Sequence, residues 1–123
     1  MTEETRQSIA LKQKQNGVDN IEKGITAHAG GTQAAALALN PSKTTHEVAT
    51  VATAADSIKL PLAVGSGVQH LVHNSSATSL QLFGDGTDTI NAVATATGVA
   101  IAAGKSRLLT DIAVGKWVSM LSA

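Results

Sequence analysis

The sequence predicts a mainly β protein: a small antiparallel β-sandwich or barrel-like domain preceded by a short helical or extended N-terminal arm. Apolar residues recur at every second position in short runs, as in Ile58, Leu60 and Leu62, and a period of two is typical of strands. Turn-forming clusters separate the runs, such as Gly-Ser-Gly at 65–67 and Gly-Asp-Gly at 84–86. Strands of about five residues at a spacing of about ten indicate an antiparallel sandwich or barrel.

The chain divides into two predicted segments. Residues 1–31 are expected to form an N-terminal arm and linker that makes attachment or oligomer contacts, and residues 32–123 the β-domain. Met1–Gly24 carries eight charged residues and few apolar ones, so it cannot bury itself. It would therefore order on neighbouring copies or on a larger surface, or remain a tail.

The arm has a thin apolar pattern. Val18, Ile21 and Ile25 are spaced by three and four, which favours a short helix, whereas Gly17 interrupts any longer one. Two short helices or a partly extended arm fit this pattern. The Gly-rich stretch 24–32 is predicted to be a linker.

The β-domain is expected to begin after an ambiguous alanine-rich segment. Gln33–Leu39 fits a helical turn or a first strand, and Pro41 ends it. Beyond Thr44 the β pattern is steady. We expect strands at 46–52, 57–62, 68–73, 79–83, 88–92, 98–102, 106–112 and 116–121.

The composition predicts a weak core. The 123 residues suffice for one domain and an arm, but 21 are alanine, and the chain has one Phe, one Trp and no Tyr. Small side chains bury little apolar area, and without cysteines no disulfide can compensate. We therefore expect the protein to be stabilised by self-association.

Charge and hydropathy disfavour several kinds of partner. The formal net charge is zero, and no Lys/Arg cluster forms the basic stripe that nucleic acids require. The charged N-terminus does not resemble a secretion signal, and no apolar run approaches the ~20 residues of a membrane helix. We expect neither nucleic acid nor membrane as a partner.

Two sets of polar residues are candidate metal-binding sites. His70 and His73 are metal ligands by type, but residues three apart on a strand point to opposite faces, so they cannot share one ion. We expect His70 to be buried or half-buried at a sheet face or subunit interface, and His73 to lie in a turn. Asp85 and Asp88 resemble part of a calcium loop but lack its other ligands, so a turn with Asp side-chain hydrogen bonds is expected.

No catalytic residues, cofactor or metal site are predicted, and we expect the protein not to be an enzyme. No serine lies in a nucleophile motif, and no carboxylate pair suggests a glycan hydrolase. Trp117 and Phe83 are expected to fill the core or an interface. The residues that we nominate for interfaces are Ile9, Val18, Ile21, Ile25, His70 and Trp117.

A series of short motifs follows in order between Val48 and Met120. They are Leu60-Pro61, His73-Asn74, Leu82-Phe83-Gly84, Thr89-Ile90-Asn91, Ala103-Gly104-Lys105 and Gly115-Lys116-Trp117. In these motifs and their order, the region resembles small β-rich structural proteins of tailed bacteriophages, which include head decoration proteins, head fibres and tail-fibre modules. In this chain, His70 interrupts the usual valine-rich form of the third strand.

This resemblance implies a viral structural protein of the virion, assembled in the bacterial host cytoplasm. Such proteins commonly form trimers and attach to the particle through an N-terminal part. The expected function is that of a capsid decoration (cement) protein, a homotrimer bound to the major capsid protein through residues 1–31. The alternative is a fibre or tail-tip module that recognises a host receptor or glycan through the loops at 74–78 and 84–88.

Overall fold

The computed structural model describes residues 20–122 of the chain. This part contains ten strands and no helix. The strands are β1 (Ile21–Thr26), β2 (Leu37–Ala38), β3 (Thr45–Thr50), β4 (Ser57–Lys59), β5 (Gln69–Asn74), β6 (Leu80–Phe83), β7 (Thr89–Ile90), β8 (Val99–Ile101), β9 (Ser106–Ala113) and β10 (Lys116–Leu121).

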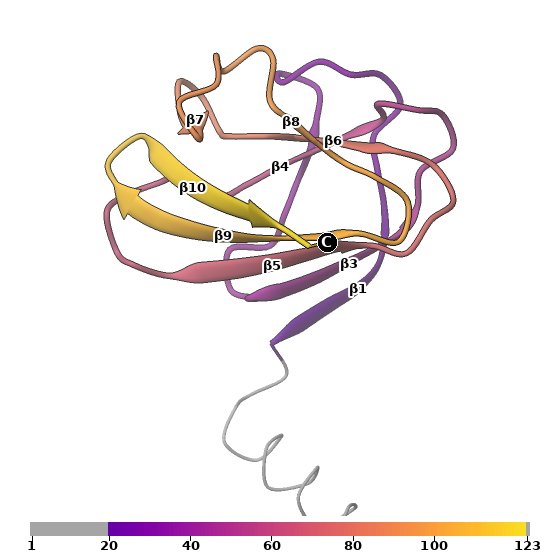
Figure 1. The fold of residues 1–123 in the computed structure, drawn as a ribbon, viewed down its shortest axis with the longest axis horizontal. Coiled ribbons are helices and arrows are strands. Elements are labelled where there is room, and N and C mark those ends of the chain that lie inside the picture. The colour runs from indigo at the N-terminus through magenta and orange to yellow at the C-terminus, as the bar shows by residue number, and fades with distance from the viewer. Residues whose placement is uncertain (1–19, 123) are drawn as a thin grey trace, which may run out of the picture.

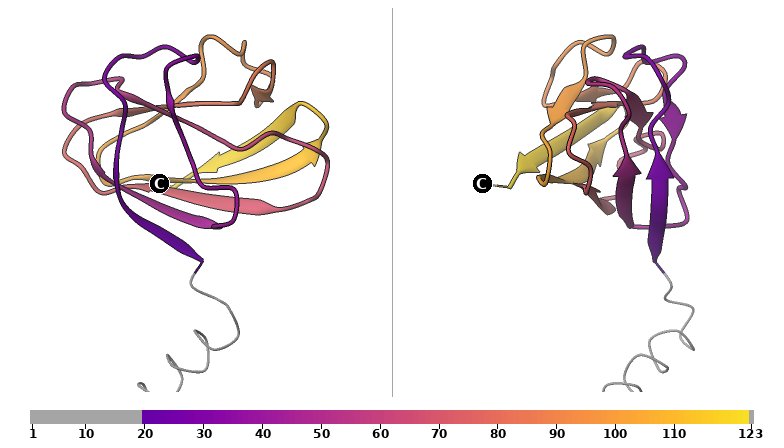
Figure 2. Two further views of the ribbon diagram at one scale, coloured as in Figure 1. Left: turned by 180° about the vertical axis from the view of Figure 1, so that it is seen from behind. Right: turned by 90° about the vertical axis from the view of Figure 1, so that its right-hand side faces the viewer.

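The strands form two sheets, and the chain passes back and forth between them. One sheet has the order β1-β3-β5-β9-β10-β7 and the other the order β2-β4-β6-β8. Figure 1 shows β1, β3, β5, β9 and β10 along one side of the molecule and β4, β6 and β8 along the other. Because each of the first eight strands is followed by a crossing to the other sheet, the architecture is solenoid-like. The two further views in Figure 2 show the same layers from behind and from the side.

The prediction of a mainly β protein is confirmed, but the strand arrangement differs from an antiparallel sandwich. β1, β3 and β5 pair in parallel, as do β2, β4 and β6, and β7 pairs in parallel with β10. Antiparallel pairing joins β5 to β9, β9 to β10 and β6 to β8. A chain that crosses to the second sheet and returns lays its next strand in the same direction as the previous one, which explains the parallel pairs.

Each of the eight predicted strand ranges overlaps one strand of the structure. The structure adds β1 and β2. The ambiguous segment Gln33–Leu39 contains a turn, in which the Ala36 N–H bonds to the Gln33 carbonyl, followed by strand β2.

Part of the predicted arm and linker lies within the sheet. β1 pairs with β3, and its Ile25 is buried in the core. Gly24, expected in a linker, has φ +66° at the point where the β1–β3 register shifts, so its left-handed conformation allows a bulge. Residues 1–19 of the arm lie outside the described part of the chain.

The core lies between the two sheets and follows from the period of two. In β5, for example, His70, Val72 and Asn74 are buried, while Gln69 and Leu71 are exposed. The largest apolar side chains of the core are Val48, Ile58, Leu60, Val72, Leu80, Leu82, Phe83, Ile90, Ile101, Leu109 and Trp117.

Gly98 lies where the turn before β8 packs closely against β6, so a substitution there tests this contact. It has φ +61°, and a Cβ placed there would lie 2.8 Å from Cδ1 of Phe83 and closer still to the Leu82 carbonyl oxygen. We expect Gly98→Ala to lower the free energy of unfolding by about 2–4 kcal/mol, because overlap with the β6 backbone adds to the strain of positive φ. Urea denaturation measures the change.

Gly104 provides the matched control. It has φ +72°, but a Cβ there has no atom within 4 Å. We expect Gly104→Ala to lower the free energy of unfolding by only about 1 kcal/mol, from backbone strain alone. Equal losses in the two variants would contradict the close packing at Gly98.

Candidate functional site

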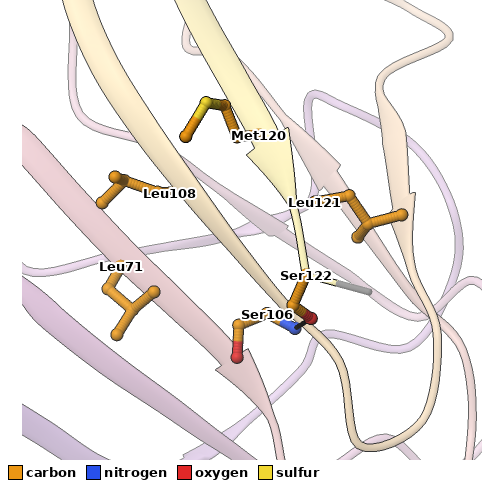
Figure 3. Close-up of a pocket in the computed structure, with 6 residues that line it drawn as sticks. All are labelled: Leu71, Ser106, Leu108, Met120, Leu121 and Ser122. Carbon is orange, nitrogen blue, oxygen red and sulfur yellow. Dashed lines mark hydrogen bonds between the residues drawn. The ribbon is translucent and has the colours of Figure 1, made fainter.

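The outward side of the first sheet carries a row of apolar side chains. Leu71 on β5 lies directly opposite Leu108 on β9, and Leu108 lies opposite Met120 on β10. Figure 3 shows these three side chains on adjacent strands. In the same register, Gln69, Thr110 and Val118 form the next row.

We define the apolar face as Leu71, Leu108, Ile112, Val118 and Met120. The exposed fraction is 37% for Leu71, 53% for Ile112, 40% for Val118 and 66% for Met120. Their neighbours along each strand, such as His70, Leu109 and Trp117, are buried. The side chains of the apolar face therefore point away from the core because of strand alternation.

Two shallow hollows lie on this side of the sheet. One, of about 200 Å³, is shown in Figure 3 and has a mainly apolar lining of Leu71, Ser106, Leu108, Met120, Leu121 and Ser122. The other, of about 240 Å³, adjoins Ile112, Trp117 and Val118. Neither lining contains a carboxylate or a histidine, so these hollows fit apolar side chains better than reacting groups.

A buried polar cluster lies on the opposite side of the same strands. The Nδ1 atom of His46 is 2.8 Å from Oε1 of Glu22, and its Nε2 atom is 2.9 Å from Nδ1 of His70. The two rings stack with centroids 5.1 Å apart, and the ring of His70 meets Trp117 edge-on at 5.7 Å. His46 is fully buried and His70 is 2% exposed. The cluster thus links β1, β3, β5 and β10 through side chains.

Burial lowers the pKa of His70 below its usual value, and the adjacent His46 lowers it further. A backbone hydrogen bond to Lys43 and the charge of Asp111 act in the opposite direction. The indole Nε1 of Trp117 is buried and has no hydrogen-bond partner among residues 20–122, so within this part Trp117 contributes packing and ring contact rather than a polar link.

Asp111 on β9 holds the loop between β4 and β5. Its carboxylate accepts hydrogen bonds from the N–H groups of Val64 (3.0 Å), Gly65 (2.7 Å) and Ser66 (3.2 Å), and from the Ser66 hydroxyl (2.9 Å). Burial alone would raise the pKa of Asp111, but these hydrogen bonds together hold it below its usual value. The carboxylate is therefore engaged as a structural anion.

Asp56 and Asp88 bind backbone in a similar way. Asp56 accepts hydrogen bonds from the N–H groups of Gly30 and Thr53, both at 3.1 Å. Asp88 accepts one at 2.7 Å from Ala63. Both aspartates are nearly fully buried. Their carboxylates support loops and do not face an open cleft.

The nominated interface residues occupy different environments. Ile21 is 43% exposed, whereas Ile25, His70 and Trp117 are buried within the protein itself. The expected burial of His70 is confirmed. Ile9 and Val18 lie outside the described residues.

His73 was expected in a turn, but it lies in β5, where its Nδ1 is 2.6 Å from the Ser106 hydroxyl. The turn at Asp85 and Asp88 is present, with the Asp88 N–H bonded to the Asp85 carbonyl. The Asp88 side chain, however, accepts from distant Ala63 rather than from its own turn.

Sequence reasoning missed His46. The signal was available, because His46 and Val48 alternate along one strand and both face the core. Its contact with His70 depends on the β3–β5 register, in which His46 lies opposite Val72, and no local pattern encodes that register.

Within residues 20–122, no cluster of three or more His, Cys, Asp or Glu side chains is arranged for a metal ion. The same residues include no helix of the length and apolarity needed to cross a membrane. Comparison with protein-family models, curated proteins and solved structures finds no match to this chain.

We expect Asp111→Asn to lower the free energy of unfolding by about 2–4 kcal/mol, because the amide supplies one oxygen where the carboxylate supplies two charged ones.

The free energy of unfolding of the wild type should also fall as the pH drops below about 4, since the folded protein holds Asp111 ionised more strongly than the unfolded chain does. Urea titrations at several pH values measure both effects. A parallel acid dependence in the wild type and Asp111→Asn would contradict this role.

Proposed function

We propose that this protein is a structural component of a bacteriophage virion, a decoration protein of the head that acts as a homotrimer. In this proposal the apolar face is buried between copies, and the N-terminal segment binds the major capsid protein. The role is assembly and not catalysis. The virion class follows from the sequence resemblance between Val48 and Met120.

The observation that carries the proposal is the apolar face. Its five side chains extend over three adjacent strands, and the intervening outward residues, Gln69 and Thr110, are uncharged. Soluble monomers rarely expose contiguous apolar patches of more than a few hundred Å². A face of this kind is typical of a protein–protein contact.

A second copy of this chain is the occupant that fits best. The formal net charge is zero and the pI is about 6.9, so copies do not repel each other near neutral pH. The five side chains of the apolar face are uncharged, so packing this face against a neighbouring copy buries no unpaired charge. A specific interface needs about 800 Å² on each partner, which is a small part of the 6739 Å² that the protein exposes.

The mechanism of decoration is thermodynamic. A protein that binds only the assembled capsid stabilises it in proportion to the logarithm of its free concentration over its dissociation constant. A trimer presents three N-terminal segments to neighbouring capsid subunits. Their combined binding exceeds that of a single segment because the second and third contacts become intramolecular.

The alternative, a receptor-binding module, depends on the loops at 74–78 and 84–88. In the first loop the Asn74 side chain accepts from the Ser76 N–H (3.0 Å) and hydroxyl (2.7 Å) and donates to the Thr78 carbonyl (2.8 Å). The polar groups of Asn74, Ser76 and Thr78 thus form hydrogen bonds with one another rather than facing a ligand. This internal bonding favours the assembly role.

We expect the wild-type protein to sediment as a trimer and Met120→Glu to sediment as a monomer, because association would bury an unpaired carboxylate. Analytical ultracentrifugation measures the change. Val114→Glu is the charge-matched control: Val114 is 80% exposed at the β9–β10 turn, outside the apolar face, and this variant should remain trimeric. A monomeric wild type, or a trimeric Met120→Glu, would contradict the interface.

We expect particles lacking the protein to release DNA at a lower temperature than complete particles, and added protein to restore the difference. A DNA-binding dye followed during heating measures the release. If stripped and complete particles behave alike while host adsorption requires the protein, the receptor-binding alternative holds instead.

A further inference from the structure

We propose that the histidine pair, His46 and His70, makes the attachment of the N-terminal strands β1 and β3 to the rest of the sheet dependent on pH. The pair spans the β3–β5 contact, the junction between these two strands and the strands that follow. This inference concerns the fold itself and holds whichever partner the protein has.

The hydrogen bonds of the cluster fix how many protons it can hold. The Glu22 carboxylate only accepts, so Nδ1 of His46 donates to it at 2.8 Å. The second ring nitrogen of His70 donates to the backbone carbonyl of Lys43, since the Lys43 N–H is already bonded to Asn40. The remaining contact, 2.9 Å between Nε2 of His46 and Nδ1 of His70, has room for one proton.

With this shared proton, the two rings hold three protons in total, one more than two neutral imidazoles. The pair therefore carries a single positive charge. The ionised Glu22 neutralises that charge from β1. Every ring nitrogen then has a partner. The singly protonated pair is therefore the state that best suits this buried site.

Adding a further proton to the singly protonated pair breaks this hydrogen-bond arrangement. Both facing nitrogens would then carry hydrogen, so the His46–His70 bond would be replaced by an N–H to N–H contact. Two positive rings would also stack with centroids 5.1 Å apart in a site almost without solvent. The resulting repulsion acts directly across the β3–β5 pairing.

The charged groups around the pair do not offset a second charge. Among residues 20–122, Glu22 on β1 is the only carboxylate within hydrogen-bond distance of either ring. Asp111 on β9 attracts a proton to His70, but its oxygens are held by the 64–66 loop. From β10 the pair meets Trp117, which is neutral. Burial and His46 together therefore outweigh Asp111 and lower the pKa of His70.

The direction of the pH effect on stability follows from the lowered pKa of His70. His70 in the unfolded chain takes up its proton near pH 6.5, whereas in the folded protein it does so only at lower pH. The folded state thus binds fewer protons, and its stability falls as the pH drops below about 6.5. β1 responds first because, among the strands that the structure describes, it pairs in its sheet only with β3.

Hydrogen exchange measured by mass spectrometry on the full-length protein tests this inference. After correction for intrinsic exchange, lowering the pH from about 7 to about 5 should reduce the protection of β1 and β3 by up to about tenfold per pH unit. The hairpin β9–β10 should keep its protection over the same range. Unchanged protection of β1 and β3 would overturn the proposal.

Two variants separate the pair from other titrating groups. His70→Gln cannot take up a proton, so β1 and β3 should lose their pH dependence in this variant. His73→Gln, on the same strand but facing the other way, should behave as the wild type. Loss of the pH dependence in His73→Gln, or its persistence in His70→Gln, would contradict the proposal.

The wild-type protein provides a second readout that needs no folded variant. Trp117 is the only tryptophan, the chain has no tyrosine, and the indole touches His70 edge-on. A protonated imidazole quenches indole emission, so the fluorescence of Trp117 should fall with a midpoint below pH 6.5. Emission that stays constant from about pH 8 to about pH 5 would overturn the assignment of the second proton to this pair.

Discussion

In a stack of short strands, the chain repeatedly leaves one sheet for the other, and the backbone N–H groups in these crossings have no strand beside them. Buried N–H groups need an acceptor. Some of these groups, such as those of His28 and Leu39, bond to backbone carbonyls of β4. Others bond to carboxylates: Asp111 and Asp88 hold the β4–β5 loop, and Asp56 holds the loop that follows β1. The rest of the structure depends on this constraint, because each loop fixes where the next strand begins.

The same constraint accounts for how the polar residues are used. A carboxylate that accepts several backbone hydrogen bonds stays ionised and is not available to transfer protons. The histidines are likewise turned inward to each other and to Glu22. On the outward side of the first sheet, the five residues of the apolar face are uncharged, and Lys116 on β10 lies beside them at the second hollow. The interior of this protein therefore holds buried histidines and aspartates, whereas the apolar face exposes leucine, isoleucine, valine and methionine side chains.

Sequence patterns predicted the strands better than their pairing. The alternation of Val68, His70 and Val72 was readable in the sequence, and it places β5 and the burial of His70 and Val72 correctly, although Val68 lies before the strand and is exposed. Asn74, predicted in the turn cluster that follows, is instead the last buried residue of β5. Strand direction was not readable, because a period of two is identical in parallel and antiparallel sheets. β1 was missed because Gly24 at its bulge breaks the pattern.

The candidate surface and the buried cluster both depend on register, which explains why the sequence predicted neither. Leu71, Leu108 and Met120 are separated by 37 and 12 positions in the sequence and form one row only after β5, β9 and β10 align. His46 and His70 meet for the same reason. The buried position of Trp117, in contrast, follows from its size in a chain with few large side chains.

The hairpin of β9 and β10 ends the run of parallel strands in the first sheet. Strands β1, β3 and β5 run in one direction, and β9 reverses it. A duplicated pair of strands inserted before β1 would extend both parallel sets, β1-β3-β5 and β2-β4-β6, without separating strands that now pair, whereas one inserted before β5 would separate β3 from β5 and β4 from β6. Lengthening of this architecture by tandem duplication is thus directional: relatives with extra repeats would carry them on the amino-terminal side of a constant closing hairpin.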